Sequence, residues 1–209
     1  MEILYFEELD STQTYAKKLL KTKKPPFGVV AKSQKRGIGS RGNSWSEVDL
    51  GLYMSAVFLK SHFPLDMPLQ STSLYIGANI VEFLQKRGSK VWMKWPNDLY
   101  LGDQKIGGII TEVVQSTLLW GVGLNIKNSS LKYGALDIEI PSEELAQGLL
   151  EAIFKKREWK EIFRIINVEF HKSRSFCVNF GDSTKSLEKA ILNSDGSVMI
   201  DGVKKFSLR

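Results

Sequence analysis

The chain of 209 residues has little of several residue types: one cysteine, Cys177, two histidines and seven arginines. A single cysteine excludes an internal disulfide bond. The uncharged run 113–126 is 14 residues long and contains polar side chains, whereas a membrane-spanning helix needs about 20 mostly apolar residues. Residues 1–8 lack the basic and apolar regions of a signal peptide. These absences predict a cytoplasmic protein that makes no contact with a membrane.

The charge of the chain is basic, because 29 lysines and arginines outnumber 23 acidic residues and leave a net charge of +6. Basic proteins include many that bind nucleic acids, so a nucleic-acid-binding module is one open function class. Hydrophobic residues make up 43% and charged residues 25% of the chain. This composition is typical of globular proteins and excludes disorder of the whole chain. The length predicts one domain, or one domain with a small appendage.

The order of the predicted elements is a mixture of strands and helices followed by consecutive strands. Their apolar patterns and turn residues predict strands at 2–7, 28–31, 52–59, 90–94, 98–101, 105–114 and 118–126, and helices after 10–12, over 70–86 and twice within 142–172. The segment 176–209 has the pattern of short strands and turns. This order favours an α+β fold with a mixed β-sheet flanked by helices, plus a small C-terminal β appendage.

A loop over residues 34–46 contains three glycines with the spacing G-x-G-x-x-G. Such glycines let backbone N–H groups converge on phosphate or carboxylate oxygens, and Arg36 and Arg41 could add charged contacts to an anion. A dinucleotide site would need a helix after the loop, but the strand 52–59 follows. The loop therefore predicts an anion-binding site of another type. The alternative is a surface loop that binds no anion.

Three strands carry residues that are unusual in a buried sheet. Lys94 lies in an apolar strand, where its ammonium must either reach solvent or face an anionic ligand. Gly107-Gly108 and Gly121-Val122-Gly123 weaken their strands unless a backbone or a ligand comes close. Together these segments predict that one face of the sheet is lined by a ligand.

Five sequence blocks resemble those of biotin protein ligases in order and approximate spacing. They are Asp10-Ser11-Thr12-Gln13, the loop from Gln34 to Trp45, Lys94-Trp95-Pro96-Asn97-Asp98, Lys105-Ile106-Gly107-Gly108-Ile109 and Gly121-Val122-Gly123-Leu124-Asn125, and Phe206-Ser207-Leu208-Arg209 resembles the end of that family's C-terminal β domain. The resemblance implies a catalytic domain over residues 1–172, related to the class II aminoacyl-tRNA synthetase fold, and a small SH3-like β domain over 173–209.

The resemblance also implies a two-step reaction that uses ATP, Mg²⁺ and biotin. Biotin is first converted to biotinyl-5′-AMP. A lysine of a biotin carboxyl carrier protein, a subunit of acetyl-CoA carboxylase, then takes the biotinyl group. The implied biotin-binding residues are Ser11, Thr12, Gln13, Gln34, Gly37, Ile38, Gly39, Lys94 and Gly108; the implied adenylate-binding residues are Ser40, Arg41, Trp45, Asn97 and Asn125. Lys94 and Arg41 are expected to be catalytic, and no metal ligand is assigned.

The glycine loop departs from the family pattern Gly-Arg-Gly-Arg-x-Gly. Ile38 and Ser40 stand where the family has two arginines. We hypothesise that Arg41 takes over part of the phosphate contact and that the intermediate is held less tightly. The Ser-Thr motif begins at Ser11, which leaves no room before it for the winged-helix domain of some family members. The expectation is a monofunctional ligase that binds no DNA, with homodimerisation left open.

Two alternatives to a biotin ligase remain from the sequence. Lipoate or octanoate ligases have a related fold, but their Arg-Arg, Gly-Gly-Gly and His-Asp pattern is not found here. In a nucleic-acid-binding module, Trp45, Trp92 and Trp95 could stack on bases.

Overall fold

A seven-stranded mixed sheet forms the centre of the computed structural model, which describes residues 1–40, 43–45, 48–128, 133–180 and 183–206. Its strand order is β1-β2-β3-β7-β6-β5-β4. Among the described strands of this sheet, β1 and β2 pair in parallel and the other neighbouring pairs are antiparallel. The strands are β1 (Glu2–Leu9), β2 (Phe27–Gln34), β3 (Leu50–Leu59), β4 (Trp92–Lys94), β5 (Asp98–Leu101), β6 (Gln104–Val114) and β7 (Thr117–Lys127). The predicted mixed sheet is confirmed.

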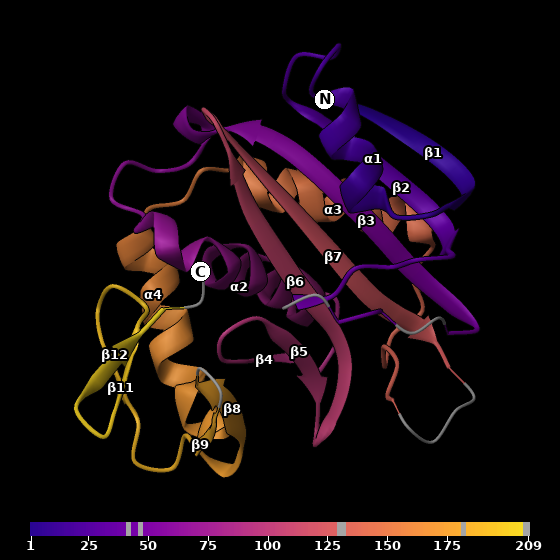
Figure 1. The fold of residues 1–209 in the computed structure, drawn as a ribbon. Helices are drawn as coiled ribbons and strands as arrows, with labels where there is room; N and C mark the ends of the chain where they lie inside the picture. The colour runs from indigo at the N-terminus through magenta and orange to yellow at the C-terminus, as the bar shows by residue number, and fades with distance from the viewer. Residues whose placement is uncertain (41–42, 46–47, 129–132, 181–182, 207–209) are drawn as a thin grey trace.

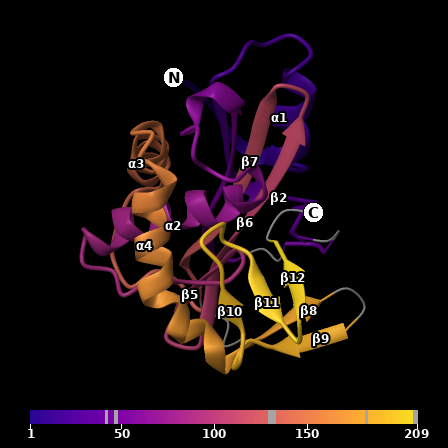
Figure 2. The same ribbon diagram turned by 90° about the vertical axis from the view of Figure 1, so that its left-hand side faces the viewer.

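Helices cover both faces of this sheet, as Figures 1 and 2 show. α1 (Thr12–Leu19) packs on one face, and α2 (Thr72–Gln85), α3 (Ser142–Phe154) and α4 (Trp159–Glu169) pack on the other. Alternation along the strands produces the two layers: Leu119 packs with α1 residues, whereas its neighbour Trp120 belongs to the larger core beneath α2 to α4. No helix in the described part of the chain is long and apolar enough to cross a membrane.

The start of α1 forms as the sequence predicts. Ser11 is the N-cap residue, with extended backbone angles, and its hydroxyl accepts a hydrogen bond from the Thr14 amide at 3.4 Å. Lys17 and Lys18 lie in the last turn, where cations interact favourably with the helix dipole. This short helix therefore begins at a defined residue and presents its first turn to the sheet.

The C-terminal region is the predicted β appendage, in the form of two small sheets. They contain β8 (Cys177–Phe180) with β9 (Ser183–Ser186), and β10 (Ile191–Leu192) with β11 (Val198–Ile200) and β12 (Val203–Lys205).

This region is joined to the rest of the molecule by a shared core. Its buried Val198 belongs to the same apolar cluster as α2 and α4. The indole N–H of Trp95 donates to the Gly196 carbonyl at 3.0 Å, and that of Trp159 donates to the Ser194 carbonyl at 2.9 Å. A segment this small cannot bury a core of its own. The boundary between 172 and 173 stays a prediction, and it falls within a 3₁₀ segment, Phe170–Ser175.

Candidate functional site

Two adjoining cavities lie where α1, the glycine loop and the sheet meet. The small chamber, of about 100 Å³, is enclosed by the start of α1, the loop and strands β3, β6 and β7. The large chamber, of about 620 Å³, extends from there to the C-terminal region. The two share Gln13, Ile38, Gly39, Ser40, Asn97 and Asp98 among their lining residues. Segments that are distant in the sequence therefore form one continuous site.

A row of hydrogen-bonding side chains lies along the small chamber. The side-chain oxygen of Gln34 accepts from the Thr12 amide at 2.8 Å, and the Thr12 hydroxyl lies 3.2 Å from the same oxygen. The Thr12 hydroxyl is also 2.9 Å from that of Ser55, which donates to the Gln13 side-chain oxygen at 3.1 Å. Ser11 lines the same chamber. The structure thus brings together Ser11, Thr12, Gln13 and Gln34, four of the residues predicted to bind biotin, and adds Ser55.

Glycines in β6 and β7 make room for protein side chains in this chamber. Gly108 and Gly123 are direct cross-strand partners, and the indole of Trp45 lies over both. A Cβ added to Gly123 would be 2.6 Å from Trp45, and one added to Gly108 would be 3.2 Å away. Likewise, a Cβ at Gly121 would be 2.8 Å from the side-chain oxygen of Gln13. The predicted glycine-lined face exists, but Trp45 and Gln13 fill much of the space that its glycines open.

The glycine loop is held as a narrow turn beside the chamber. The Trp45 amide donates to the Gly37 carbonyl at 2.8 Å, and the Gly39 amide donates to the Asn43 carbonyl at 2.6 Å. Gly37 does not line either chamber, but a side chain there would crowd Gln34 and Trp45, at 3.0 Å from each. Arg41, predicted to be catalytic, lies outside the described residues.

Two lysines meet one carboxylate where the two chambers join. Lys94 Nζ is 3.6 Å from one oxygen of Asp98, and Lys105 Nζ is 2.5 Å from the other. Lys94 lines the large chamber and Lys105 the small one. Lys94 is only 8% exposed, beside the rings of Tyr100 and Phe176. Burial therefore lowers the pKa of its ammonium, and the Asp98 carboxylate offsets part of that effect.

Lys105 is the residue of this cluster that sequence reasoning missed. Its block, Lys105-Ile106-Gly107-Gly108-Ile109, drew attention only through its glycines. The available signal was the lysine that opens the block, two residues before the first of two strand glycines. β5 lies between β4 and β6, and its Asp98 contacts Lys94 of β4 and Lys105 of β6.

Replacing Asp98 with asparagine is expected to move the alkaline limb of activity to lower pH. The Asp98 carboxylate raises the Lys94 pKa, so its loss lowers that pKa further. Lys94 would then lose its positive charge at a lower pH, and a step that needs the charge would fail sooner as pH rises. The pH profile of biotin-dependent ATP–pyrophosphate exchange measures this. An alkaline limb at an unchanged or higher pH would contradict the expected role of the pair.

The two predicted asparagines differ in position. Asn97 lines both chambers, and its amide donates to the Ile109 carbonyl at 2.7 Å, while the Ile109 amide donates to the Asn97 carbonyl at 2.8 Å. Asn125 is buried, donates to the Gly134 carbonyl at 2.8 Å and lines neither chamber. The structure therefore does not bring Asn125 to the cavities, because its amide attaches the segment after β7 to the sheet.

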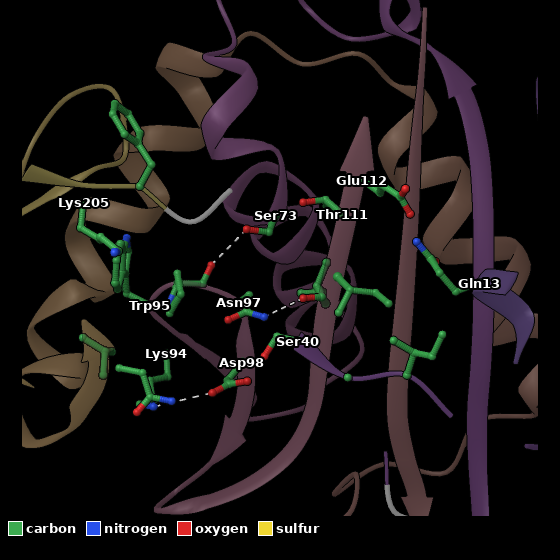
Figure 3. Close-up of a pocket in the computed structure, with 18 of the residues that line it drawn as sticks. Gln13, Ser40, Ser73, Lys94, Trp95, Asn97, Asp98, Thr111, Glu112 and Lys205 are labelled. Carbon is green, nitrogen blue, oxygen red and sulfur yellow. Dashed lines mark hydrogen bonds and ion pairs between the residues drawn. The ribbon is translucent and has the colours of Figure 1, made fainter. Parts of the chain in front are cut away.

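The large chamber runs between two charged ends, as Figure 3 shows. Lys94 and Asp98 lie at one end, and Gln13 and Glu112 lie at the other. Glu112 is ion-paired with Lys17 of α1. Part of the wall comes from the C-terminal region, through Cys177, Val178, Asn179, Lys205 and Phe206. No local motif in that region predicts a contribution to the site.

Comparison with known proteins identifies the family. The model of the Biotin/lipoate A/B protein ligase family matches residues 5–127, which include all five sequence blocks and most of the residues that line both chambers. The chain belongs to this family. The matched region contains nearly all of the seven-stranded sheet, α1, α2 and the glycine loop. The helices α3 and α4 and the C-terminal region lie beyond it.

Individual members of the biotin/lipoate ligase family support the assignment. A Helicobacter pylori biotin acetyl coenzyme A carboxylase synthetase, solved with bound biotinylated ATP, is 39% identical, with a TM-score of 0.94, and the match covers 98% of this chain and 99% of that one. The Aquifex aeolicus biotin protein ligase, solved with biotin and ATP, shares the fold at 23% identity and a TM-score of 0.78, over 100% and 96% of the two chains.

A curated relative is longer than this chain. The bifunctional ligase/repressor BirA of Salmonella typhimurium is 31% identical over 74% of this chain and 52% of its own length. The chain therefore spans about half the length of that relative.

Proposed function

We propose that this protein is a biotin protein ligase. It would couple ATP cleavage to the attachment of biotin to a lysine of a biotin carboxyl carrier protein, through biotinyl-5′-AMP. The observation that carries the proposal is the row of hydrogen-bonding groups in the small chamber, directly beside two lysines that share Asp98. The strong similarity to the Helicobacter pylori enzyme over nearly its whole length supports it.

The small chamber suits the ureido ring of biotin. That ring carries one carbonyl acceptor and two N–H donors, and Ser11, Thr12, Gln13 and Gln34 supply side-chain hydrogen-bonding groups around the chamber. A ring bound here would direct the acidic tail of biotin past Gly108 towards Lys105 and Asp98, which line the same chamber. The biotin carboxylate would then lie where the two chambers join.

Adenylation would take place at the lysine pair. A carboxylate oxygen of biotin attacks the α-phosphorus of ATP, the bond to the bridging oxygen breaks, and pyrophosphate leaves with the electron pair. The two reactants are both anions, so the positive charges of Lys94 and Lys105 offset their repulsion and stabilise charge that develops on the phosphate oxygens. Asp98 holds both lysines towards this point.

Mg²⁺ would accompany ATP. Within the described ranges, no group of three His, Cys, Asp or Glu side chains is placed to hold a metal ion. An ion bound mainly through substrate phosphates and water needs few protein ligands. We therefore assign no residue to it.

The second step would use the large chamber. The amine of an acceptor lysine attacks the acyl carbon of the mixed anhydride, the bond to the phosphate oxygen breaks, and AMP leaves. The amine must be uncharged to attack, so its proton passes to solvent or to a nearby base. The chamber volume of about 620 Å³ gives a lysine side chain room to reach the lysine pair.

The alternatives have less support. Lipoate has no ureido group, so it would offer no hydrogen-bonding groups to the polar row of the small chamber. A nucleic-acid module would need accessible aromatic faces, but Trp92 is 6% and Trp95 3% exposed, and both indole N–H groups donate to backbone carbonyls. A cytoplasmic location, homodimerisation and the absence of DNA binding stay predictions.

The proposed function is tested by incubating the protein with biotin, Mg-ATP and a biotin carrier domain, followed by a streptavidin blot. We expect biotin-labelled carrier and biotin-dependent ATP–pyrophosphate exchange. Exchange that depends on lipoate or octanoate would favour the alternative ligase. The absence of both label and exchange would overturn the proposal.

The glycine loop makes a separate prediction about the intermediate. Ser40 lines both chambers in a position where related ligases carry arginine. Ser40→Arg would add a charged contact to the adenylate phosphate, worth about 1.5–3 kcal/mol, and is expected to slow the release of biotinyl-AMP about tenfold or more. Release is measured by filtration of a preformed complex. Equal release rates in the two proteins would contradict the hypothesis that the natural loop holds the intermediate less tightly.

A further inference from the structure

Ser55 occupies a central position in the small chamber that no sequence motif indicates. It lies in β3 directly opposite Gly121 of β7, and it is completely buried, at 0% exposure. Its hydroxyl oxygen is 2.9 Å from that of Thr12 and 3.1 Å from the side-chain oxygen of Gln13. Ser55 therefore connects the two residues of α1 that face the chamber.

The hydrogens of this row can be assigned by counting donors. The side-chain oxygen of Gln13 can only accept, so the single hydroxyl hydrogen of Ser55 is donated to it. Ser55 must then accept from Thr12, whose single hydroxyl hydrogen is shared between the Ser55 oxygen at 2.9 Å and the Gln34 side-chain oxygen at 3.2 Å. The oxygen of Gln34 remains satisfied, because it accepts the Thr12 backbone N–H at 2.8 Å. The Thr12 hydroxyl thus faces the chamber with a free lone pair and no hydrogen.

This direction of hydrogen bonding matches one part of a cyclic urea. A ureido N–H needs an acceptor, and the oxygen of Thr12 is then one. The carbonyl of the same ring needs a donor. The hydroxyl oxygen of Ser11 accepts from the Thr14 amide, so its own hydrogen remains available to donate.

From this geometry, and resting on the proposed function, we propose that Ser55 is a positioning residue for biotin. It would orient the Thr12 hydroxyl as an acceptor for a ureido N–H without touching the ligand's reacting atoms. Gly121 makes the arrangement possible, because a Cβ there would lie 2.8 Å from the Gln13 oxygen and 3.2 Å from the Ser55 oxygen. The side chains of Ser55 and Gln13, which are hydrogen-bonded to each other, occupy the space that the missing Cβ leaves.

The test separates biotin binding from the rest of catalysis. In biotin-dependent ATP–pyrophosphate exchange, Ser55→Ala is expected to raise the KM for biotin about tenfold, the usual effect of losing an oriented buried hydrogen bond. The KM for ATP and kcat should not change. Ser55→Cys, which keeps a weak donor of similar size, should show a smaller increase. Thr12→Val should raise the KM for biotin as well, and adding Ser55→Ala to it should change little, because both changes remove one interaction.

A matched control is Ser197→Ala. Ser197 is also 0% exposed and hydrogen-bonded, but it lies in the C-terminal region and lines neither chamber, so both KM values should stay as in the unmodified protein. An unchanged KM for biotin in Ser55→Ala, a parallel rise in the KM for ATP, or additive effects of Ser55→Ala and Thr12→Val would overturn the inference. If Ser55→Ala does not fold, the Cys and Val variants decide the question alone. The absence of exchange in the unmodified protein would instead overturn the proposed function.

Discussion

Lys94→Ala and Lys105→Ala are each expected to lower the rate of biotin-dependent ATP–pyrophosphate exchange by about 100-fold or more. Both ammonium groups contact Asp98, one in each chamber. In the proposed reaction two anions meet at this point, so removing a fixed positive charge there should cost transition-state stabilisation of roughly 3 kcal/mol. The remaining lysine would also be held fully by Asp98, which reduces the charge that it offers to substrate.

The matched control for this prediction is Lys32→Ala. Lys32 is also ion-paired, with Glu7, but the pair is exposed and lies on β1 and β2, away from both chambers. Its removal should leave the exchange rate unchanged, since exposed ion pairs contribute little. A near-normal rate in Lys94→Ala or in Lys105→Ala would show that the lysine in question only balances the charge of Asp98. Circular dichroism of each variant confirms that the fold is intact.

Gly123→Ala is expected to lower the exchange rate more than tenfold and to destabilise the protein by about 1–3 kcal/mol. The added methyl group would lie 2.6 Å from the Trp45 indole, a distance at which one of them must move. Trp45 is connected through its amide to Gly37, so displacing the indole also shifts the loop that borders both chambers. Exchange kinetics and thermal unfolding measure the two effects.

Two further variants show whether Trp45 is the cause. Gly28→Ala adds the same group to β2, where its closest contacts would be at an ordinary 3.6 Å, so it should change neither rate nor stability by much. Trp45→Phe in the Gly123→Ala background removes part of the overlapping ring and should restore part of the stability. If Gly123→Ala retains the full exchange rate, the position of Trp45 over the glycines is unimportant for function.

Much of the fold is predictable because it depends on local periodicity. The alternation that sends Leu119 and Trp120 to opposite faces, and the Ser11 cap that begins α1, are both properties of neighbouring residues. The α+β class and the mixed sheet were confirmed for this reason. The C-terminal strands were also predictable as short elements, but their packing on Trp95 and Trp159 was not. Trp95 bonds to a residue 101 positions away and Trp159 to one 35 positions away.

The candidate site, like the fold, was only partly predictable from the sequence. Motif blocks located Ser11, Thr12, Gln34, Lys94 and the glycine loop, because each block concentrates polar or flexible residues where a sheet normally has apolar ones. Asn125 was expected to border the adenylate, but in the structure it lines neither chamber and its amide donates to the Gly134 carbonyl.

The sequence by itself determined the family, the order of the elements and the residues of α1 and β4 that face the cavities. Only the tertiary structure decided that Lys105 joins Lys94 at Asp98, that Trp45 lies over Gly108 and Gly123, and that Ser55 connects Thr12 to Gln13. The physical reason is that a charge or a hydroxyl takes its role from its partners. Those partners come from strands and helices that meet only when the sheet has formed its pairs.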